Sequence, residues 1–340
     1  MENFFVEYRD PIFGLIVLIS IILLVAVLSY LWGIFSKNNE QENIEKFIKK
    51  FDISNGLDDE HKKILQNLQV GADTLGFLAL TFAKSGDYEK AISVYLIALE
   101  KVNSNKEKRF ILTNLGKIYF KAGFLGRAEE VFLESLKLSP RNTESLTHLS
   151  VIYEKLKKFD RALEVLDALR ELGADTRSET DYIKSQIIAN NVKMPFSEKI
   201  NEILRLENGF KNAPRFALEL CLQHKEPFAN LSKFPPLEKC VDMLNDFKEA
   251  VNLEDSEYAA FFGAKGLSKN SQKSKFFEIN ALRELKKSNL NTDLAFEFVC
   301  TECKNTIPLF FYRCPICHKL DTSCIIPKIT EKRIEISQTF

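Results

Sequence analysis

The chain has little glycine and little proline, with 13 and 10 residues of these types among 340. Proteins built from many short strands and tight turns use more of both, so this scarcity argues against that class and favours long helices. Net charge is also missing, because 47 Lys and Arg residues balance 47 Asp and Glu residues. Nucleic-acid binding usually needs a basic surface. We therefore expect no nucleic acid among the partners of this chain.

Cysteine is uncommon, with seven residues, but four of them crowd near the C-terminal end as C-x-x-C, ten residues and C-x-x-C. An odd count with two such pairs favours a metal site over a secreted disulfide framework, and hence a reducing compartment. The predicted metal ligands are Cys300, Cys303, Cys314 and Cys317.

Four thiolates complete a tetrahedral shell, so the predicted site is closed and structural, and Zn²⁺ is the expected ion. Iron is the rival, because the same four-sulfur shell also holds iron. The apolar spacer IPLFFY between the pairs predicts a small β-hairpin. Cys324 is interpreted as a spare thiol, whereas Cys221 and Cys240 lie in amphipathic segments and are interpreted as small hydrophobic residues.

One long apolar run, Ile12–Leu31, is of the length that crosses a bilayer as a helix. We predict a transmembrane helix over residues 11–35. A cleaved signal peptide is the alternative, but the preceding ten residues are acidic rather than basic. The positive-inside rule sets the orientation, because Arg9 precedes the run and four lysines follow it within residues 37–50. The N-terminus is thus predicted to be periplasmic and the C-terminal body cytoplasmic, in a single-pass protein of a bacterial inner membrane.

Three segments beginning at Ala72, Arg109 and Thr143 repeat one tetratricopeptide pattern. The second and third start 34 residues apart, which is the period of these repeats, whereas the first and second start 37 apart, so we expect a small insertion at Val102–Lys108. The second segment fits best, with Gly116 and Ala128 as the small residues that let two helices approach closely. Between Thr180 and Lys287 six further segments keep a helical periodicity without the consensus. The predicted fold class is therefore all-α, with a transmembrane helix, a tetratricopeptide-type solenoid and a small C-terminal zinc knuckle.

The predicted domain organisation follows from these features. In chain order, we expect a periplasmic N-terminus (1–10), the transmembrane helix (11–35), a juxtamembrane linker with a first helix (36–70), the repeats (71–178), degenerate helical repeats (179–292), the four-cysteine zinc-binding domain (293–330) and a tail (331–340).

The repeats show little sign of a clamp for a partner's C-terminal carboxylate. Such clamps place Lys, Arg and Asn on successive first helices. Asn114 is well placed, but Phe77 and His148 occupy the equivalent positions in the neighbouring repeats, and Glu144 adds the wrong charge. His148 is interpreted as an ordinary packed or solvated residue rather than a catalytic base. No catalytic residues and no partner-binding surface are predicted, and the oligomeric state stays open.

The segments Leu115–Phe132 and Cys300–Cys317, together with the position of the apolar run, resemble the lipopolysaccharide assembly protein B family of Gram-negative bacteria. The resemblance implies a rubredoxin-like knuckle that packs on the repeats, with the four cysteines above as its ligands. It also implies an inner-membrane adaptor, not an enzyme, that presents the lipid A deacetylase (LpxC) to the membrane protease FtsH. The ten-residue N-terminal extension and the poorly aligning repeats after residue 179 depart from the family.

Two other functions stay open from the sequence. The same solenoid would serve a membrane-tethered scaffold for a secretion, pilus or flagellar machine. An enzyme or electron carrier built on the metal site is a weaker alternative, because the sequence shows no nucleophile–base constellation, phosphate loop or open metal site.

Overall fold

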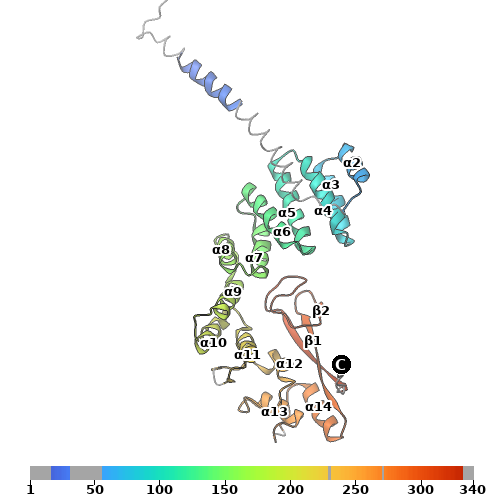
Figure 1. Ribbon diagram of the computed structural model, residues 1–340, viewed down its shortest axis with the longest axis vertical. Coiled ribbons are helices and arrows are strands. Elements are labelled where there is room, and N and C mark those ends of the chain that lie inside the picture. Colours follow the sequence, from blue (N-terminus) through green and yellow to red (C-terminus); the bar gives the residue numbers. More distant parts are fainter. Residues whose placement is uncertain (1–16, 31–55, 229–230, 270–271, 332–340) are drawn as a thin grey trace, which may run out of the picture. The chain divides into compact units, whose positions relative to one another are not determined.

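The computed structural model describes residues 17–30, 56–228, 231–269 and 272–331. Within these ranges the chain forms a long series of α-helices followed by one small sheet (Figure 1). It divides into two compact units, one ending at His148 and the other beginning at Leu149. The predicted helical solenoid is confirmed, whereas the C-terminal sheet is larger than the sequence led us to expect.

The helices are α2 (Asp59–Asn67), α3 (Ala72–Lys84), α4 (Tyr88–Glu100), α5 (Asn105–Lys121), α6 (Leu125–Leu138), α7 (Thr143–Lys155), α8 (Phe159–Glu171), α9 (Arg177–Asn190), α10 (Phe196–Arg205), α11 (Ala213–His224), α12 (Val241–Leu244), α13 (Ser256–Lys265) and α14 (Phe277–Lys287). The strands are β1 (Thr292–Cys300), β2 (Thr306–Ile307) and β3 (Ser323–Glu331).

The predicted transmembrane helix falls only partly on described residues. Residues 17–30 are helical, and their apolar side chains are exposed, for example Leu24 at 60%. The rest of the predicted span, 11–16 and 31–35, lies outside the described residues, as do the segment 1–10 that was predicted to be periplasmic and most of the predicted tail. Among the described helices none is both long and apolar enough to cross a membrane. The transmembrane helix therefore stays a prediction.

The repeats share one tight turn between their two helices. Gly86 and Gly123 adopt left-handed backbone angles there, with φ of 88° and 84°. The next amide donates to a carbonyl five residues back, from Asp87 to Phe82 and from Phe124 to Tyr119, each at 2.9 Å. Glycine has no Cβ to clash in this conformation, which explains why the consensus places it at this turn.

Inside the first unit, the second repeat shows why its small residues are needed. A Cβ atom added to Gly116 of α5 would lie 2.7 Å from the ring of Phe132 on α6. Phe132, Tyr119 and Ala128 are fully buried. The two helices therefore pack with the Phe132 ring of α6 in direct contact with the backbone of α5 at Gly116. The predicted roles of Gly116 and Ala128 agree with this close contact.

A buried polar cluster joins α5, α6 and the start of α7 within the same unit. The Nδ2 atom of Asn142 lies 2.9 Å from the Thr113 hydroxyl, 3.1 Å from the Ser135 hydroxyl and 2.9 Å from the Ser145 hydroxyl. Because buried polar groups are costly unless paired, this cluster fixes the register of three helices rather than merely holding them together.

In the second unit, five of the six predicted amphipathic segments form regular helices, α9, α10, α11, α13 and α14. The sixth, expected over residues 236–247, is instead a 3-10 turn (Leu237–Lys239) followed by the four-residue α12. Cys240 interrupts the two with φ −146° and ψ 5°. Its buried Sγ lies 3.1 Å from the Tyr258 hydroxyl, so the break is tied to α13.

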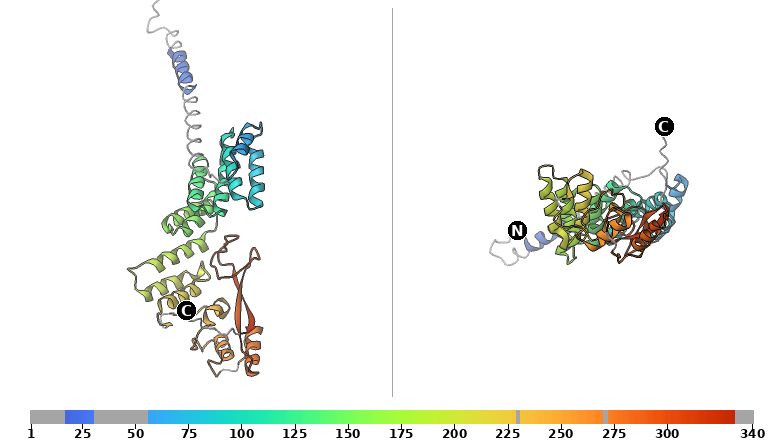
Figure 2. Two further views of the ribbon diagram at one scale, coloured as in Figure 1. Left: turned by 45° about the vertical axis from the view of Figure 1, so that its right-hand side comes forward. Right: turned by 90° about the horizontal axis from the view of Figure 1, so that it is seen from below.

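The sheet has the strand order β2-β1-β3, with both pairings antiparallel. Over nine residues β1 pairs with β3, from Thr292 opposite Glu331 to Cys300 opposite Ser323. Figure 2 shows this long hairpin beside α14. A half-buried ion pair of 2.7 Å between Lys265 of α13 and Asp293 anchors the start of β1.

The hairpin corrects the sequence-based expectation. A small β-hairpin was predicted inside the spacer IPLFFY, but that segment contributes only Ile307 to the two-residue β2. The main hairpin is formed by the segments flanking the cysteine pairs, and the two pairs lie in the connection between β1 and β3. The prediction was wrong because the pairing joins segments far apart in the chain, which local periodicity does not report.

Candidate metal centre

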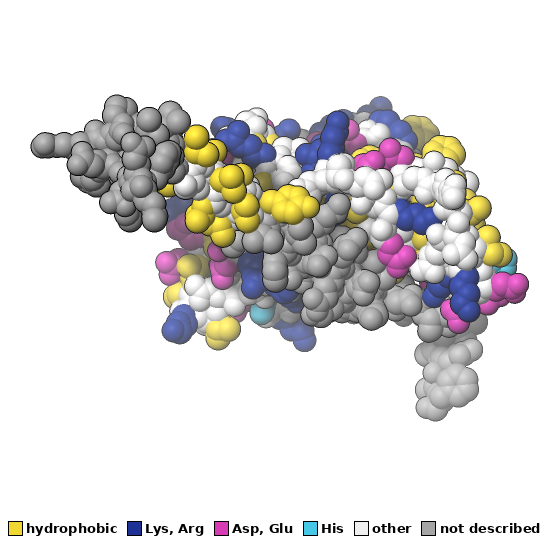
Figure 3. All heavy atoms as spheres, turned by 90° about the horizontal axis from the view of Figure 1, so that it is seen from above, with side chains coloured by type: hydrophobic (Ala, Val, Ile, Leu, Met, Phe, Trp, Pro, Cys, Tyr) yellow, Lys and Arg dark blue, Asp and Glu magenta, His cyan; other side chains and the backbone are white. Residues whose placement is uncertain are grey.

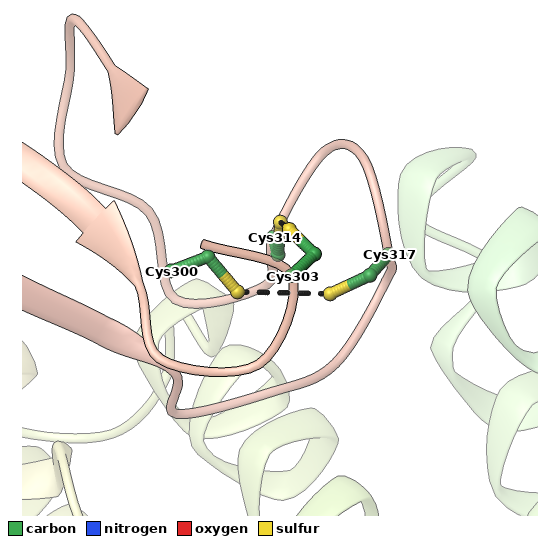
Figure 4. Close-up of side chains that lie close together, drawn as sticks. All are labelled: Cys300, Cys303, Cys314 and Cys317. Carbon is green, nitrogen blue, oxygen red and sulfur yellow. Dashed lines mark hydrogen bonds between the residues drawn. The ribbon is translucent and has the colours of Figure 1, made fainter. Parts of the chain in front are cut away.

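The four predicted metal ligands come together at one end of the β1–β3 hairpin (Figure 4). Their sulfur atoms all lie within 4.8 Å of one another. Two pairs join one C-x-x-C segment to the other, with 3.7 Å between Cys300 and Cys317 and 3.7 Å between Cys303 and Cys314. None of the four is in a disulfide.

The two C-x-x-C segments fold in the same way. The amide of the first cysteine donates to a carbonyl five residues later, from Cys300 to Asn305 at 3.0 Å and from Cys314 to Lys319 at 2.9 Å. The residue after the second cysteine is left-handed in both, Lys304 with φ 61° and His318 with φ 60°. This backbone reversal turns both cysteines of each segment toward the same point.

The spacing of the sulfur atoms fits a metal ion. A tetrahedron with Zn–S bonds of about 2.3 Å has S···S edges of about 3.8 Å. The two cross-segment distances of 3.7 Å match that edge, whereas a disulfide would need about 2.05 Å. All four corners are side chains of this chain, so an ion held here would have no position open for a substrate.

Hydrogen bonds favour the thiolate form at two of the sulfurs. Burial alone would raise the pKa of Cys300, but the Thr322 hydroxyl and the amides of Cys303 and Glu302 lower this pKa to about 6. The side chain and amide of Asn305 lower the pKa of Cys303. At Cys317 burial dominates and raises the pKa to about 12. A cation at the centre would stabilise the negative charge of the Cys317 thiolate, which burial otherwise disfavours.

The knuckle, defined as residues 298–322, has a very small core. Its buried members are Phe298, Cys300, Phe311 and Cys314, with partly buried apolar side chains packed around them. Half of this core consists of candidate metal ligands. A core of this size is too small to fold alone, so an ion at the centre would supply much of the stability of the knuckle.

Charged and polar side chains fasten the knuckle to helices of the same unit. Arg313, directly before Cys314, places its Nε 2.7 Å from a carboxylate oxygen of Glu154 on α7, and both side chains are nearly buried. Its Nη1 also donates to the carbonyl of His318 at 2.8 Å. Burial raises the pKa of Glu154 despite the guanidinium beside it.

A second fastening involves α11 and the turn before it. The Tyr312 hydroxyl donates to Glu219, and Asp321 accepts 2.8 Å bonds from the Lys211 amide and from the side chain of Asn212. Arg215 lies 3.5 Å from the centre of the Phe310 ring while it pairs with Asp242. A cavity of about 540 Å³ remains between these groups. Among its charged lining residues, Glu154 pairs with Arg313, Arg215 pairs with Asp242 and Glu219 accepts a hydrogen bond from Tyr312.

Sequence reasoning missed these fastening residues. The one available signal is Arg313 itself, a lone cation inside the aromatic run FFYRC. Its partner Glu154 lies 159 residues away in the chain, in a repeat whose consensus does not specify that position.

The other singled-out residues do not join the site. Cys221 and Cys240 are fully buried, and burial raises their pKa values to about 11 and about 12, which suits small hydrophobic residues. Cys324 is exposed. The ring of His148 stacks on Phe132 at 5.1 Å, and burial lowers its pKa. Of the two ordinary roles expected for His148, packed or solvated, the structure shows the packed one.

The charged side chains visible in Figure 3 mix both signs rather than gathering one. In the repeats, Lys117 pairs with Glu144, so one cation near Asn114 is already neutralised.

Comparisons with known proteins identify the repeat region of the chain. Two family models described as tetratricopeptide repeat match residues 74–109 and 113–176. These matches confirm the predicted repeats. They leave the second half of the chain, including the knuckle, unmatched by these two models.

Among curated proteins, the chain is similar to lipopolysaccharide assembly protein B of Escherichia coli K12, at 29% identity over 103 residues. This stretch covers 30% of the present chain and 26% of that protein. The chain is also similar to the CTR9 homolog of Arabidopsis thaliana, at 33% identity over 90 residues, which is 26% of the chain and 8% of that protein.

Solved structures with likeness to the chain include YrrB, described as a TPR protein with an unusual peptide-binding site, and MamA. YrrB aligns with a TM-score of 0.38 and 19% identity over 56% of this chain and 94% of its own. MamA aligns with a TM-score of 0.36 and 19% identity over 52% and 93%. These scores are too low to support a conclusion about function or partners.

Proposed function

We propose that this chain is a non-catalytic adaptor of lipopolysaccharide assembly that holds a structural zinc ion in its C-terminal knuckle. The observation that carries the proposal is the 29% identical stretch shared with lipopolysaccharide assembly protein B. The folded chain also brings four cysteines together in a cluster that could hold a metal ion. That stretch covers only 26% of the curated relative. The activity and the partners of the present chain are therefore proposed.

The proposed action is to present the lipid A deacetylase (LpxC) to the membrane protease FtsH. Tetratricopeptide repeats are protein-binding scaffolds, and the matched residues 74–109 and 113–176 give the chain such a scaffold. The proposed location is a bacterial inner membrane, with the apolar run Ile12–Leu31 as the anchor and the repeats in the cytoplasm.

Depletion of the protein in its own cells tests the adaptor role. Turnover of the deacetylase should slow, and lipopolysaccharide should rise, because the protease loses the factor that delivers its substrate. An unchanged half-life of the deacetylase would sink the adaptor function. Failure of motility or secretion in the same cells would instead favour a scaffold for another envelope machine.

The metal is tested separately. Elemental analysis of the purified chain should give about one zinc per chain, since four thiolates at tetrahedral spacing suit that ion. Stoichiometric iron with a visible absorption band would favour an electron carrier. For the topology, a C-terminal reporter that is active only in the periplasm should stay silent.

A further inference from the structure

One side chain outside both C-x-x-C segments reaches the cysteine cluster. The hydroxyl oxygen of Thr322 lies 3.3 Å from the sulfur of Cys300, and both residues are buried. Thr322 comes directly before β3, where its carbonyl accepts a 2.8 Å hydrogen bond from the Thr301 amide. The next residue, Ser323, pairs with Cys300 in the sheet. The hairpin register therefore fixes the threonine at the sulfur.

The hydroxyl has one proton and two acceptors within reach. Besides the Cys300 sulfur, the carbonyl oxygen of Lys319 lies 3.3 Å away. As a neutral thiol, Cys300 donates its own proton to the Thr322 hydroxyl, and that hydroxyl donates to the Lys319 carbonyl. A metal-bound thiolate carries negative charge, and hydrogen bonds to ionised acceptors are about twice as strong as neutral ones. Metal binding thus directs the proton of Thr322 to the sulfur.

The charge of a loaded site explains why such a donor matters. Four thiolates around a divalent ion leave two negative charges in a small, largely buried cluster. Donors from the knuckle backbone offset part of that charge, with the amides of Glu302 and Cys303 directed at Cys300 and the amide of Lys319 at Cys317. Asn305 adds a side-chain donor at Cys303 from within its own segment. Thr322 adds one from the opposite strand.

We propose that Thr322 is a positioning residue of the metal centre, whose hydroxyl donates to the Cys300 thiolate and sets how tightly the ion is retained. The inference rests on the metal site of the proposed function, but it needs no partner protein. It assigns a role to a residue that neither C-x-x-C segment contains, and it ties retention of the ion to the pairing of β1 with β3.

The Thr322→Val variant tests the proposal, because valine keeps the shape of threonine and removes only the hydroxyl. Zinc affinity is measured on the full chain by competition with a chromophoric chelator, and Co²⁺ replaces zinc for the sulfur-to-metal charge-transfer bands. We expect Thr322→Val to weaken zinc binding by about 10- to 100-fold and to shift these bands. Thr322→Ser, which restores the hydroxyl, should return both measurements to near wild type.

Thr306→Val is the matched control, since Thr306 lies exposed in β2 of the same sheet. It should leave affinity and bands unchanged. Wild-type affinity and unshifted bands in Thr322→Val would overturn the proposal. So would equal losses in Thr322→Val and Thr322→Ser, because the shape of the side chain rather than its hydroxyl would then matter. A wild-type chain that binds no metal would overturn it too, whereas the half-life of the deacetylase tests the adaptor role independently.

Discussion

The repeats and the knuckle reach a stable structure by different means. In the first unit, α3 to α6 bury a continuous set of apolar side chains, among them Tyr95, Tyr119 and Phe132, and small residues let the helices approach closely. In the knuckle the buried core has four members, two of which are cysteines of the candidate metal centre. The repeats therefore carry their own driving force for folding, whereas we expect the knuckle to depend on a bound metal ion and on the helices beside it.

The two regions also differ in how they use polar groups. The buried cluster around Asn142 is built from neutral side chains that lie within two successive repeats. The knuckle is fastened by charged groups, Arg313 to Glu154 and Asp321 to the turn before α11, which are distant in the chain. Buried charges are costly when one partner is lost, so the knuckle should respond to single substitutions more sharply than the repeats.

The largest expected effect is unfolding of the knuckle, but not of the repeats, when a metal ligand is removed. Cys314→Ser removes a buried ligand from the candidate centre, and the remaining core is too small to keep the knuckle folded. Hydrogen exchange should show lost amide protection over the knuckle, residues 298–322, with α3 to α6 unchanged. Cys324→Ser, at an exposed cysteine, should leave both regions protected. Retained amide protection of the knuckle in Cys314→Ser would show that the knuckle, like the repeats, folds without a complete metal site.

The next effect concerns the fastening of the knuckle. Glu154→Leu leaves the guanidinium of Arg313 nearly buried without its counter-charge, which costs about 3–5 kcal/mol. In cobalt-loaded protein, the charge-transfer band should disappear at a lower denaturant concentration than in wild type. Replacing both residues, Glu154→Leu with Arg313→Met, should recover much of the loss because no unpaired charge remains.

An exposed pair offers the control for that prediction. Lys275 and Glu238 form an ion pair, and the side chains are 58% and 50% exposed, respectively. Glu238→Leu should therefore change the free energy of unfolding by only about 0–1 kcal/mol. A Glu154→Leu effect no larger than this control would contradict a fastening role for the buried pair.

A smaller effect is expected from the packing of the repeats. Gly116→Ala would place a methyl group 2.7 Å from the Phe132 ring, and such overpacking costs about 1–3 kcal/mol. Gly126→Ala is the matched control, because α6 leaves open space at that position and alanine favours a helix. Circular dichroism during denaturation should show the first variant destabilised and the second unchanged or slightly stabilised. Equal behaviour of the two would contradict the close contact.

How much of this was predictable follows from how local each feature is. The three repeats and five of the six later helices could be predicted, because helical periodicity and the Gly86 and Gly123 turns are local signals. The grouping of the four cysteines could be predicted because each C-x-x-C turn is itself local. Ligation of an ion by them stays a prediction.

The remaining features depend on segments that meet only in the folded chain. The alternation of Leu294, Phe296 and Phe298 is the one local sign of β1, but its partner β3 begins after the knuckle. Arg313 and Glu154 give no local sign of each other, and neither do Thr322 and Cys300. Reading such pairs from sequence would require knowing the register of the hairpin and the path of the helices first.

The smallest expected effect compares the turns of successive repeats. Lys157 lies 34 residues after Gly123 and has the same left-handed backbone, with φ 57°, while the next amide again donates to a carbonyl five residues back, Tyr153 at 2.8 Å. A non-glycine residue in this conformation costs about 1–2 kcal/mol, partly offset by the greater freedom of glycine in the unfolded chain. Lys157→Gly should therefore raise the free energy of unfolding by up to about 1 kcal/mol, measured by denaturation. Gly123→Ala should lower it by a similar amount, because it introduces the strain that Lys157 already bears. A destabilised Lys157→Gly would mean that the lysine side chain stabilises its turn by contacts that outweigh this backbone strain.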